Sequence, residues 1–419
     1  MGVWMVRALW ALAAALLPQD PQASWTEAED RRAEELLEGF YAKPEDRAGT
    51  LKELRKMPPL PADRVDRLSA RALEMARKHG PKLEEKGGTL DHPKYKGKYL
   101  VKLPADFDPK KTYPLAIGLH GGGQNLGDAA WAEKAYGYMA EKGGCIGVYP
   151  EVLQKRYAEW GRSSEEAEYV EEVIDAAMRT WNIDTDRVYM MGDSMGGYGT
   201  WHIGGTLADR LSALGSHAGG ILRLGRNPWG IGVIPNLRNT PIYFTHGAQD
   251  QPAPIGSDRR ADQILSQLRK EDPGGYEHRY TEFPDRGHSI PRDELVKSMD
   301  WILERKRDAN AKRLVWETYY GWKREFGWLK LDRPELGQKV AAEIKENRVE
   351  LTLTKVNGDL RVRLNRELVD VSKPVTIVVD GRVSWEGKPS ASVAVLAESA
   401  LGLDARRLYA YEVPVREEY

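Results

Sequence analysis

"YMMGDSMGGYGTW", residues 189–201, places one serine between a run of strand-forming residues and three glycines. A serine gains little free energy from burial, so this position calls for a chemical reason. Residues 192–196, "GDSMG", have the form G-x-S-x-G, with a predicted strand before them and a predicted helix after them. Such a turn lifts the hydroxyl clear of the sheet, and its glycines let neighbouring backbone come close. The stretch therefore predicts a nucleophilic serine, Ser194, at the carboxyl edge of a sheet.

Apolar strands alternate with amphipathic helices on both sides of this turn. "YPLAIGLHGGG", "GGCIGVYPE" and "TPIYFTHGAQD" are expected to be buried strands, and "EAEYVEEVIDAAMRTW" has its apolar residues at helical spacing. This alternation predicts an α/β fold with a mostly parallel sheet and helices on both faces. We place this catalytic domain at residues 86–312.

Two segments are expected before that domain. Residues 1–23 contain a short basic start and an apolar run that is too short to cross a bilayer, so they predict a signal peptide and an exported (periplasmic or secreted) protein. A packed N-terminal helix is the alternative. Residues 24–85 predict a helical N-terminal segment, opened by a capping box in "SWTE" between Ser24 and Glu27. No later segment is long and apolar enough to predict a membrane span in the mature protein.

Residues 313–419 predict a separate, small β-rich C-terminal domain with no cluster of catalytic residues. The dipeptides Asn357-Gly358 and Asp380-Gly381 stand between alternating strand patterns, and each predicts a two-residue hairpin turn. "LYAYEVPV" predicts a last strand. The role of this domain and the oligomeric state of the protein are left open by the sequence.

Composition excludes several classes of function. Lys plus Arg number 62 and Asp plus Glu number 63, for a net charge of −1, which gives no basis for nucleic-acid binding. The chain has one cysteine, Cys145, so it can form no internal disulfide, and no cysteine-based zinc or redox site is expected. We expect neither a metal nor an organic cofactor.

A serine hydroxyl needs a base to take its proton, and the base needs an acid to orient it. His288 follows a predicted strand on a loop, where ligands bind in parallel sheets, whereas His278 lies inside that strand. Asp250 follows the strand "PIYFTH" and is preferred to Asp285, which is close to His288 in sequence. Ser194, Asp250 and His288 are therefore the predicted catalytic residues.

Further residues are expected around them. The backbone N–H groups of Gly122, Gly123 and Met195 are candidates for an oxyanion hole, since "LHGGGQ" ends an early strand and Met195 follows the serine. Trp160, Tyr198 and Trp201 are candidates for substrate-binding walls, because aromatic faces stack on aryl or sugar groups. His120 and His246 are expected to be structural, holding their loops by hydrogen bonds.

"LHGGGQ", "GDSMGGYGTW", "HGAQD" and "GH", in this order over about residues 90–307, resemble the alpha/beta-hydrolase superfamily. Within it the chain is most similar to polyhydroxybutyrate depolymerase and feruloyl esterase-like enzymes and to predicted prolyl-oligopeptidase-like serine hydrolases. The resemblance implies the same three catalytic residues, the oxyanion donors near Gly122 and at Met195, and hydrolysis of a carboxylic ester. The chain lacks the cysteines of the well-studied depolymerases and adds its C-terminal domain, which puts a polymer substrate in doubt.

The expected function is a serine esterase that forms an acyl-enzyme on Ser194 with a small-molecule or polymer-derived ester. A serine peptidase of the same fold is the first alternative, because no residue separates amide from ester cleavage. A catalytically inert envelope- or glycan-binding protein on a hydrolase scaffold is the second. A dienelactone-type hydrolase is a further alternative. Its usual form has a cysteine as the nucleophile at this turn, so Ser194 excludes that form.

Overall fold

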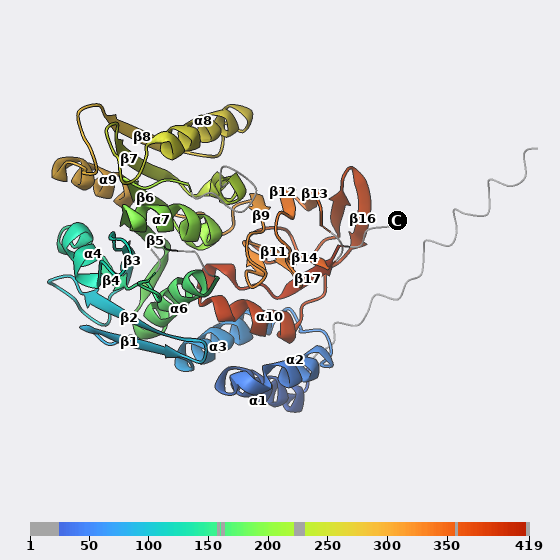
Figure 1. Ribbon diagram of the computed structural model, residues 1–419. Helices are drawn as coiled ribbons and strands as arrows, with labels where there is room; N and C mark the ends of the chain where they lie inside the picture. The colour runs from blue at the N-terminus through green and yellow to red at the C-terminus, as the bar shows by residue number, and fades with distance from the viewer. Residues whose placement is uncertain (1–24, 157–159, 161–163, 222–230, 357–358, 416–419) are drawn as a thin grey trace, which may run out of the picture.

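The computed structural model describes residues 25–156, 160, 164–221, 231–356 and 359–415 (Figure 1). The predicted signal peptide lies outside this range. N-terminal helices, a large sheet with its helices, and two smaller C-terminal sheets follow one another along the chain. Among the described residues, no helix has both the length and the apolar character that crossing a membrane requires.

The large sheet has eight strands in the order β1-β2-β4-β3-β5-β6-β7-β8. The two pairings that involve β2 are antiparallel, and all pairings from β4 to β8 are parallel, which confirms the predicted mostly parallel sheet. The strands are β1 (Gly87–His92), β2 (Tyr95–Lys102), β3 (Tyr113–Leu119), β4 (Ile146–Pro150), β5 (Ile183–Asp193), β6 (Ala213–His217), β7 (Ile242–Gly247) and β8 (His278–Phe283).

Helices cover both faces of this sheet because its strands are apolar on both sides. In β3, Leu115 and Ile117 join the core under one set of helices, whereas Ala116 between them joins the core under the other set. The first set comprises α6 (Ser164–Thr180), α7 (Met195–Thr206), α8 (Gly256–Glu271), η2 (Ala208–Arg210) and η3 (Ile231–Asn239). The second comprises α4 (Ala129–Tyr136), α5 (Tyr138–Glu141) and α9 (Arg292–Leu303).

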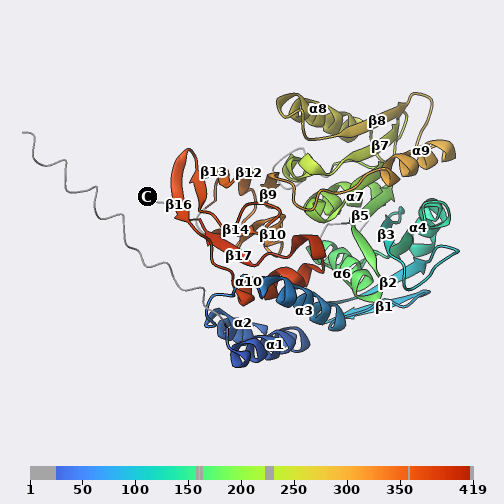
Figure 2. The same ribbon diagram turned by 180° about the vertical axis from the view of Figure 1, so that it is seen from behind.

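The N-terminal helices are α1 (Glu27–Ala42), η1 (Pro44–Asp46), α2 (Arg47–Arg55) and α3 (Val65–Lys78). A capping box opens α1, but it joins Thr26 to Glu29, two residues later than the predicted pair. These helices pack against the C-terminal helix α10 (Val393–Ser399), where the Tyr41 hydroxyl donates to the Ala397 carbonyl over 2.9 Å. Both views show the N-terminal helices beside α10, although they lie at opposite ends of the sequence (Figures 1 and 2).

The C-terminal region has two sheets, in the orders β16-β15-β13-β12-β9 and β10-β11-β14-β17. Their buried strand residues form one continuous core with the N-terminal helices and one face of the large sheet. The strands are β9 (Arg313–Glu317), β10 (Glu325–Phe326), β11 (Leu329–Leu331), β12 (Lys339–Lys345), β13 (Arg348–Thr354), β14 (Leu360–Leu364), β15 (Val375–Val379), β16 (Arg382–Gly387) and β17 (Tyr411–Pro414); η4 (Ala400–Gly402) and η5 (Ala405–Arg407) precede the last.

One of the two predicted hairpins is wrong. Asp380-Gly381 joins β15 to β16 as expected, with both residues at positive φ. The strands flanking 357–358, which lie outside the described residues, belong to different sheets: β13 pairs with β12 and β15, and β14 pairs with β11 and β17. The chain passes from one sheet to the other here, so the local turn signal did not decide the pairing.

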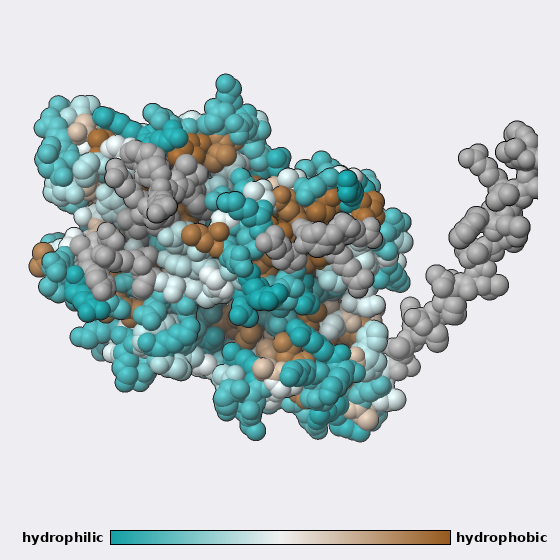
Figure 3. Space-filling view, turned by 45° about the vertical axis from the view of Figure 1, so that its right-hand side comes forward, coloured by the Kyte–Doolittle hydropathy of each residue, from teal (hydrophilic) through white to brown (hydrophobic). Residues whose placement is uncertain are grey.

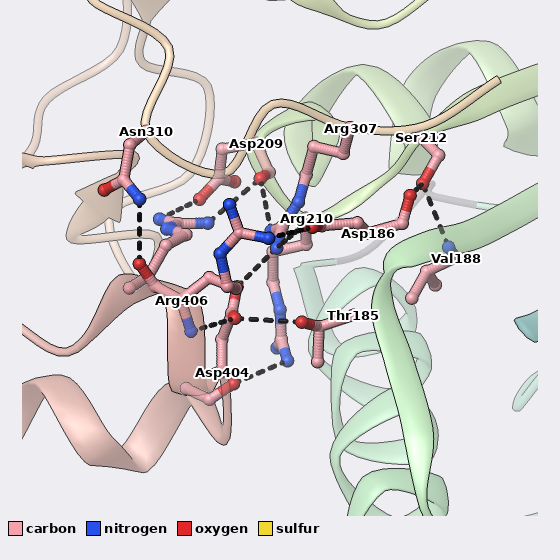
Figure 4. Close-up of polar contacts among 12 residues, drawn as sticks. Thr185, Asp186, Val188, Asp209, Arg210, Ser212, Arg307, Asn310, Asp404 and Arg406 are labelled. Atoms are coloured by element: carbon pink, nitrogen blue, oxygen red, sulfur yellow. Dashed lines mark hydrogen bonds and ion pairs between the residues drawn. The ribbon is translucent and has the colours of Figure 1, made fainter. Parts of the chain in front are cut away.

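Charged side chains join the large sheet to the C-terminal region (Figure 4). Arg307 contacts Asp404 and lies 3.3 Å from Asp186, whose other carboxylate oxygen is 2.9 Å from Arg406. The Thr185 hydroxyl donates to Asp404 over 2.9 Å. The face shown in Figure 3 is largely hydrophilic, and its hydrophobic side chains gather in a few patches.

Candidate active site

Ser194 lies on the turn between β5 and α7 in a strained conformation. Its φ of 53° and ψ of −119° fall in a region that side chains other than glycine rarely adopt. The turn is held by the Ser194 N–H, which donates to the His217 carbonyl at the end of β6 over 2.7 Å. Strain of this kind costs about 1–3 kcal/mol and persists only where surrounding contacts impose it.

The glycines around the serine are required by close backbone packing. A Cβ atom on Gly192 would lie 2.2 Å from the Gly196 carbonyl oxygen, and one on Gly196 would lie 2.2 Å from the Leu119 carbonyl oxygen. Both contacts are far inside van der Waals range and involve backbone that has no room to move. The turn is therefore pressed between its own helix and the end of β3, as the spacing of glycines predicts.

The serine hydroxyl, an imidazole and a carboxylate form a hydrogen-bonded line. Ser194 Oγ lies 2.8 Å from His288 Nε2, and His288 Nδ1 lies 2.6 Å from Asp250 Oδ2. With the Nδ1 proton donated to the carboxylate, Nε2 is free to accept the serine proton. The structure thus brings together the three residues that the sequence order predicts, and His288 turns to Asp250 rather than to Asp285.

Backbone contact between two loops fixes the imidazole beside the carboxylate. The Gln249 N–H donates to the Arg286 carbonyl over 2.8 Å, between the loop after β7 and the loop after β8. A Cβ on Gly247 would lie 2.2 Å from the Gly287 carbonyl oxygen, so the two loops touch at that glycine. Parallel pairing of β7 with β8 brings both loops to the same sheet edge.

The loop after β3, which carries Gly122 and Gly123, is held by His120. The His120 Nδ1–H donates to the Gly121 carbonyl over 2.8 Å, and Nε2 accepts the Val152 N–H over 3.1 Å. Burial lowers the pKa of His120, in agreement with a neutral ring that donates on one side and accepts on the other. Gly122 has a φ of 131°, which glycine adopts readily. His120 is therefore structural, as expected.

Sequence reasoning missed Asp193, the residue just before the serine. Its carboxylate lies against the loop after β3, where a Cβ on Gly121 would be 2.6 Å from Asp193 Oδ2. Burial raises the pKa of Asp193, opposed by the charge of His288 and by backbone N–H groups that include that of Gly121. The G-x-S-x-G pattern leaves this position free, so the motif gave no signal for it.

Two of the three predicted substrate walls are buried in the core. Trp160 and Trp201 have no exposed surface. Trp160 donates to the His120 carbonyl over 3.0 Å, and Trp201 packs edge-on against Phe244 of β7, with the ring centroids 5.0 Å apart. Both predictions are wrong: Trp201 is enclosed because α7 lies between the sheet and the C-terminal region, and Trp160 packs against α7 at Gly199. Tyr198 is half-buried.

His246, predicted to be a hydrogen-bonded loop residue, lies within β7 and is fully buried. Its Nε2 lies 3.2 Å from Asp250 Oδ2, the oxygen that also contacts His288. Its Nδ1 lies 2.8 Å from Asp258 Oδ2 in the first turn of α8. The predicted acid is thus flanked by two imidazoles.

Comparison with known proteins agrees with this arrangement. A family model described as phospholipase/carboxylesterase matches residues 154–304, which include the serine turn and both loops that carry Asp250 and His288. This part of the chain belongs to the alpha/beta-hydrolase superfamily. The matched residues 154–304 hold only part of the large sheet. The strands before them and the two C-terminal β-sheets complete the fold.

The curated relatives are larger proteins. A bifunctional acetylxylan esterase/xylanase of Neocallimastix patriciarum is 28% identical over 151 residues, 36% of this chain and 21% of the relative. Dipeptidyl-peptidase 5 of Aspergillus fumigatus is 25% identical over 249 residues, 48% of this chain and 33% of the relative. The chain thus spans a fifth to a third of their length.

Solved structures also match in part. A thermostable esterase shares 22% identity and a TM-score of 0.43, over 53% of this chain and 63% of that one. A hydrolase is the activity class that the family match supports, while both esterase and peptidase names occur among the relatives.

Proposed function

We propose that this protein is a serine hydrolase that cleaves a carboxylic ester through an acyl-enzyme on Ser194. The proposal rests on one observation, the hydrogen-bonded line from Ser194 Oγ through His288 to Asp250, with distances of 2.8 and 2.6 Å. A nucleophile within hydrogen-bond reach of a base that is oriented by a third group is the arrangement that acyl transfer requires.

In the first half of the reaction, Ser194 Oγ attacks the ester carbonyl while His288 Nε2 takes the serine proton. The imidazolium that forms is stabilised by Asp250, whose side chain is fully buried and whose Oδ1 accepts the Ala253 N–H over 2.9 Å. His288 then gives the proton to the departing alcohol, and the acyl group stays on the serine.

The negative charge on the carbonyl oxygen needs donors that are already in place. The Met195 N–H stands at the start of α7, where the first helical N–H groups have no partner within the helix. The N–H groups of Gly122 and Gly123 belong to the loop after β3, which meets the serine turn where Gly121 approaches Asp193. We assign these groups to the oxyanion hole, where one donor lowers the barrier by about 3 kcal/mol.

In the second half, water attacks the acyl-enzyme with His288 as the base, and the acid is released. His288 keeps 29% of its side-chain surface exposed, so water can reach the imidazole. The carboxylate behind it is closed off from solvent, which keeps its charge directed at the ring.

A peptidase is the second candidate, because the similarity to dipeptidyl-peptidase 5 covers 48% of this chain. The same serine, base and acid can cleave an amide, although an amide is the harder acyl donor. The ratio of kcat/KM for a p-nitrophenyl ester to that for a peptide p-nitroanilide separates the two, and a ratio near one would favour the peptidase.

Ser194→Ala tests the proposal directly. We expect the wild-type protein to be labelled by a fluorophosphonate and to hydrolyse p-nitrophenyl acetate, and the variant to do neither, with a kcat lower by about 10⁶-fold, as in another serine hydrolase. The melting temperature should change little, because the strained backbone is kept. Labelling of a residue other than Ser194, or no labelling of the wild-type protein, would contradict the proposal and favour an inert binding protein.

A further inference from the structure

Asp250 has neighbours on both sides, and only one of them is the base. Oδ1 accepts the Ala253 N–H, and Oδ2 faces His288 Nδ1 at 2.6 Å and His246 Nε2 at 3.2 Å. A carboxylate with no exposed side-chain surface must be compensated by the groups around it. Asp250 meets no lysine or arginine among the described ion pairs, so one backbone amide and the rings of two histidines compensate its charge.

The proton positions on His246 follow from its acceptors. Nε2 lies 2.6 Å from the Ala253 carbonyl oxygen, which can only accept, so Nε2 carries a hydrogen. Asp250 Oδ2 lies 3.2 Å from the same nitrogen, within ion-pair distance, which places the ring beside the acid of the active site. On the opposite side, Nδ1 faces Asp258 Oδ2 at 2.8 Å.

Asp258 and His246 hold a proton between them. Burial by itself lowers the pKa of His246, but the hydrogen bond and charge of Asp258 outweigh it, and the pKa is raised. Burial raises the pKa of Asp258, against the opposing contact with His246. A proton in this pair keeps it neutral overall and keeps both ring nitrogens in donor geometry.

Other groups face the pair from three elements. Glu282 stands opposite His246 in the pairing of β7 with β8, and it is bonded to Arg259 over 2.6 Å. From α7, the indole of Trp201 favours the charged form of Asp258. Burial raises the pKa of Tyr280 on β8, with a smaller effect from Asp258. These groups surround the pair, and His246 is the member of the pair that lies within ion-pair distance of Asp250.

We propose that His246, held by Asp258, is a positioning residue that supports Asp250 from the side opposite His288. This inference rests on the proposed function and deepens it, because it assigns a second histidine to the orientation of the acid. Without the His246 ring, the buried Asp250 carboxylate keeps His288 as its one imidazole partner. The carboxylate then turns or takes up a proton, and the imidazole loses its orientation and its counter-charge.

The test uses His246→Leu, which removes the donor, and His246→Gln, whose amide nitrogen reaches the place of Nε2. His202 on α7 supplies the matched control: it is also buried, and its Nε2 bonds to the Tyr320 hydroxyl over 2.6 Å, away from Asp250. His202→Leu therefore removes a buried histidine of the same kind without touching the acid.

The first measurement is independent of turnover. The proton on His288 Nδ1, in its 2.6 Å hydrogen bond, should give a ¹H NMR signal well downfield of the amide protons. We expect this signal in the wild-type protein and in His202→Leu, and we expect it to disappear or move upfield in His246→Leu. A signal unchanged in His246→Leu would overturn the inference.

The second measurement is kcat per serine titrated with fluorophosphonate, which corrects for unfolded protein. We expect His246→Leu to lower kcat about 10- to 100-fold, the range found for outer partners that orient a site, with KM nearly unchanged. His246→Gln should recover most of this loss. Equal kcat per titrated site in His246→Leu and His202→Leu would show a merely structural histidine and reject the role.

The two measurements separate the inference from the proposed function. If the wild-type protein is neither labelled nor active on esters, the proposed function fails, while the NMR signal still decides whether His246 holds the acid. If the protein is active and the signal and kcat of His246→Leu match those of the control, the function stands and the positioning role falls.

Discussion

Two regions of this molecule bury charge, and they do so for different ends. At the sheet edge, the buried carboxylate of Asp250 faces one backbone amide and two imidazoles, and one of these, His288, reaches solvent. Between the sheet and the C-terminal region, Asp209 is surrounded by Lys323 and Arg407, which neutralise it on the spot. The first arrangement leaves a charge available for chemistry, and the second uses charge to hold two parts of the chain together.

The difference is visible in what each region leaves unfinished. The charged region encloses a cavity of about 540 Å³ whose lining carries acidic and basic side chains in nearly equal number. Most of these charges are paired across elements, as in Arg210 with Asp175 and Lys330 with Glu398. At the sheet edge, by contrast, the negative charge of Asp250 has no lysine or arginine partner among the described residues. This suits the reaction, because His288 must be able to gain a proton beside a fixed negative charge.

Within this comparison of the two charged regions, the largest effect should come from Asp250→Asn, which removes the charge from the first region and keeps its shape. Since the amide can present N–H to His288, it favours the wrong tautomer, and kcat should fall about 10⁴-fold, as in other enzymes with this arrangement. The measurement is kcat on a p-nitrophenyl ester, with circular dichroism as a check of folding. Asp285→Asn is the matched control, and a comparable loss there instead would move the acid to Asp285.

The interface should respond in stability rather than in rate. Asp209→Asn leaves Lys323 and Arg407 buried without their shared counter-charge, and we expect a loss of about 3–5 kcal/mol in the free energy of unfolding. Urea denaturation measures it. The kcat of the folded fraction should stay unchanged, so a fall in kcat equal to that of an active-site variant would erase the contrast between the two regions.

The same residue sets a pH dependence. Burial alone would raise the pKa of Asp209, but Lys323 and Arg407 hold it well below its usual value. A depressed folded-state pKa contributes stability above the unfolded value of about 3.9, and this contribution is lost as pH falls towards the folded value. Wild-type stability should therefore drop steeply below about pH 5, and Asp209→Asn should flatten that part of the curve.

A smaller pH effect is expected from His202, which joins α7 to Tyr320 of the C-terminal region. Burial lowers the pKa of His202 to about 4 from its usual 6.5. The unfolded chain binds the proton first, so stability falls as pH drops from about 6.5 to 4, by about 3 kcal/mol in full. His202→Gln should reduce the slope by this amount in thermal unfolding measured between pH 7 and pH 4, while His120 and His217, whose pKa burial also lowers, keep the remainder. An unchanged slope would contradict the contribution of His202.

The sequence predicted the elements that depend on neighbouring residues, but not which side chains are buried by contacts with distant parts of the chain. The strand, turn and helix at residues 189–201 follow from side chains that are neighbours in the chain. Ser194, Asp250 and His288 could be predicted to converge because each follows a parallel strand whose end lies at the same sheet edge. Trp201 looked like a pocket wall because its spacing from Tyr198 is visible, whereas Phe244, which covers it, lies on β7.

The pairing errors have the same origin. Asn357-Gly358 has the composition of a hairpin turn, but the partner of β14 is chosen by burial against β11 and β17, far away in sequence. Asp193 and Asp258 carried no signal at all, because each acquires its role through a contact with a residue many positions away, Gly121 and His246 respectively. A sequence shows which residues have catalytic side chains, but it does not show which distant residues contact a buried charge.

Asp193 belongs neither to the predicted catalytic residues nor to the charged interface, and the smallest effect in this comparison is expected from it. Its carboxylate is half-buried beside the serine, where the charge of His288 and the Gly121 N–H act on it. If it serves as a fixed acceptor for the loop that carries Gly122, Asp193→Asn should keep kcat within about threefold, and Asp193→Ala should lower it about tenfold through one lost hydrogen bond of about 1.5 kcal/mol. If its charge matters instead, the amide should fare as badly as the alanine. The ratio of the two kcat values therefore shows which property of Asp193 matters. A high ratio indicates a structural hydrogen-bond acceptor, and a ratio near one indicates that its negative charge acts on the site, as that of Asp250 does.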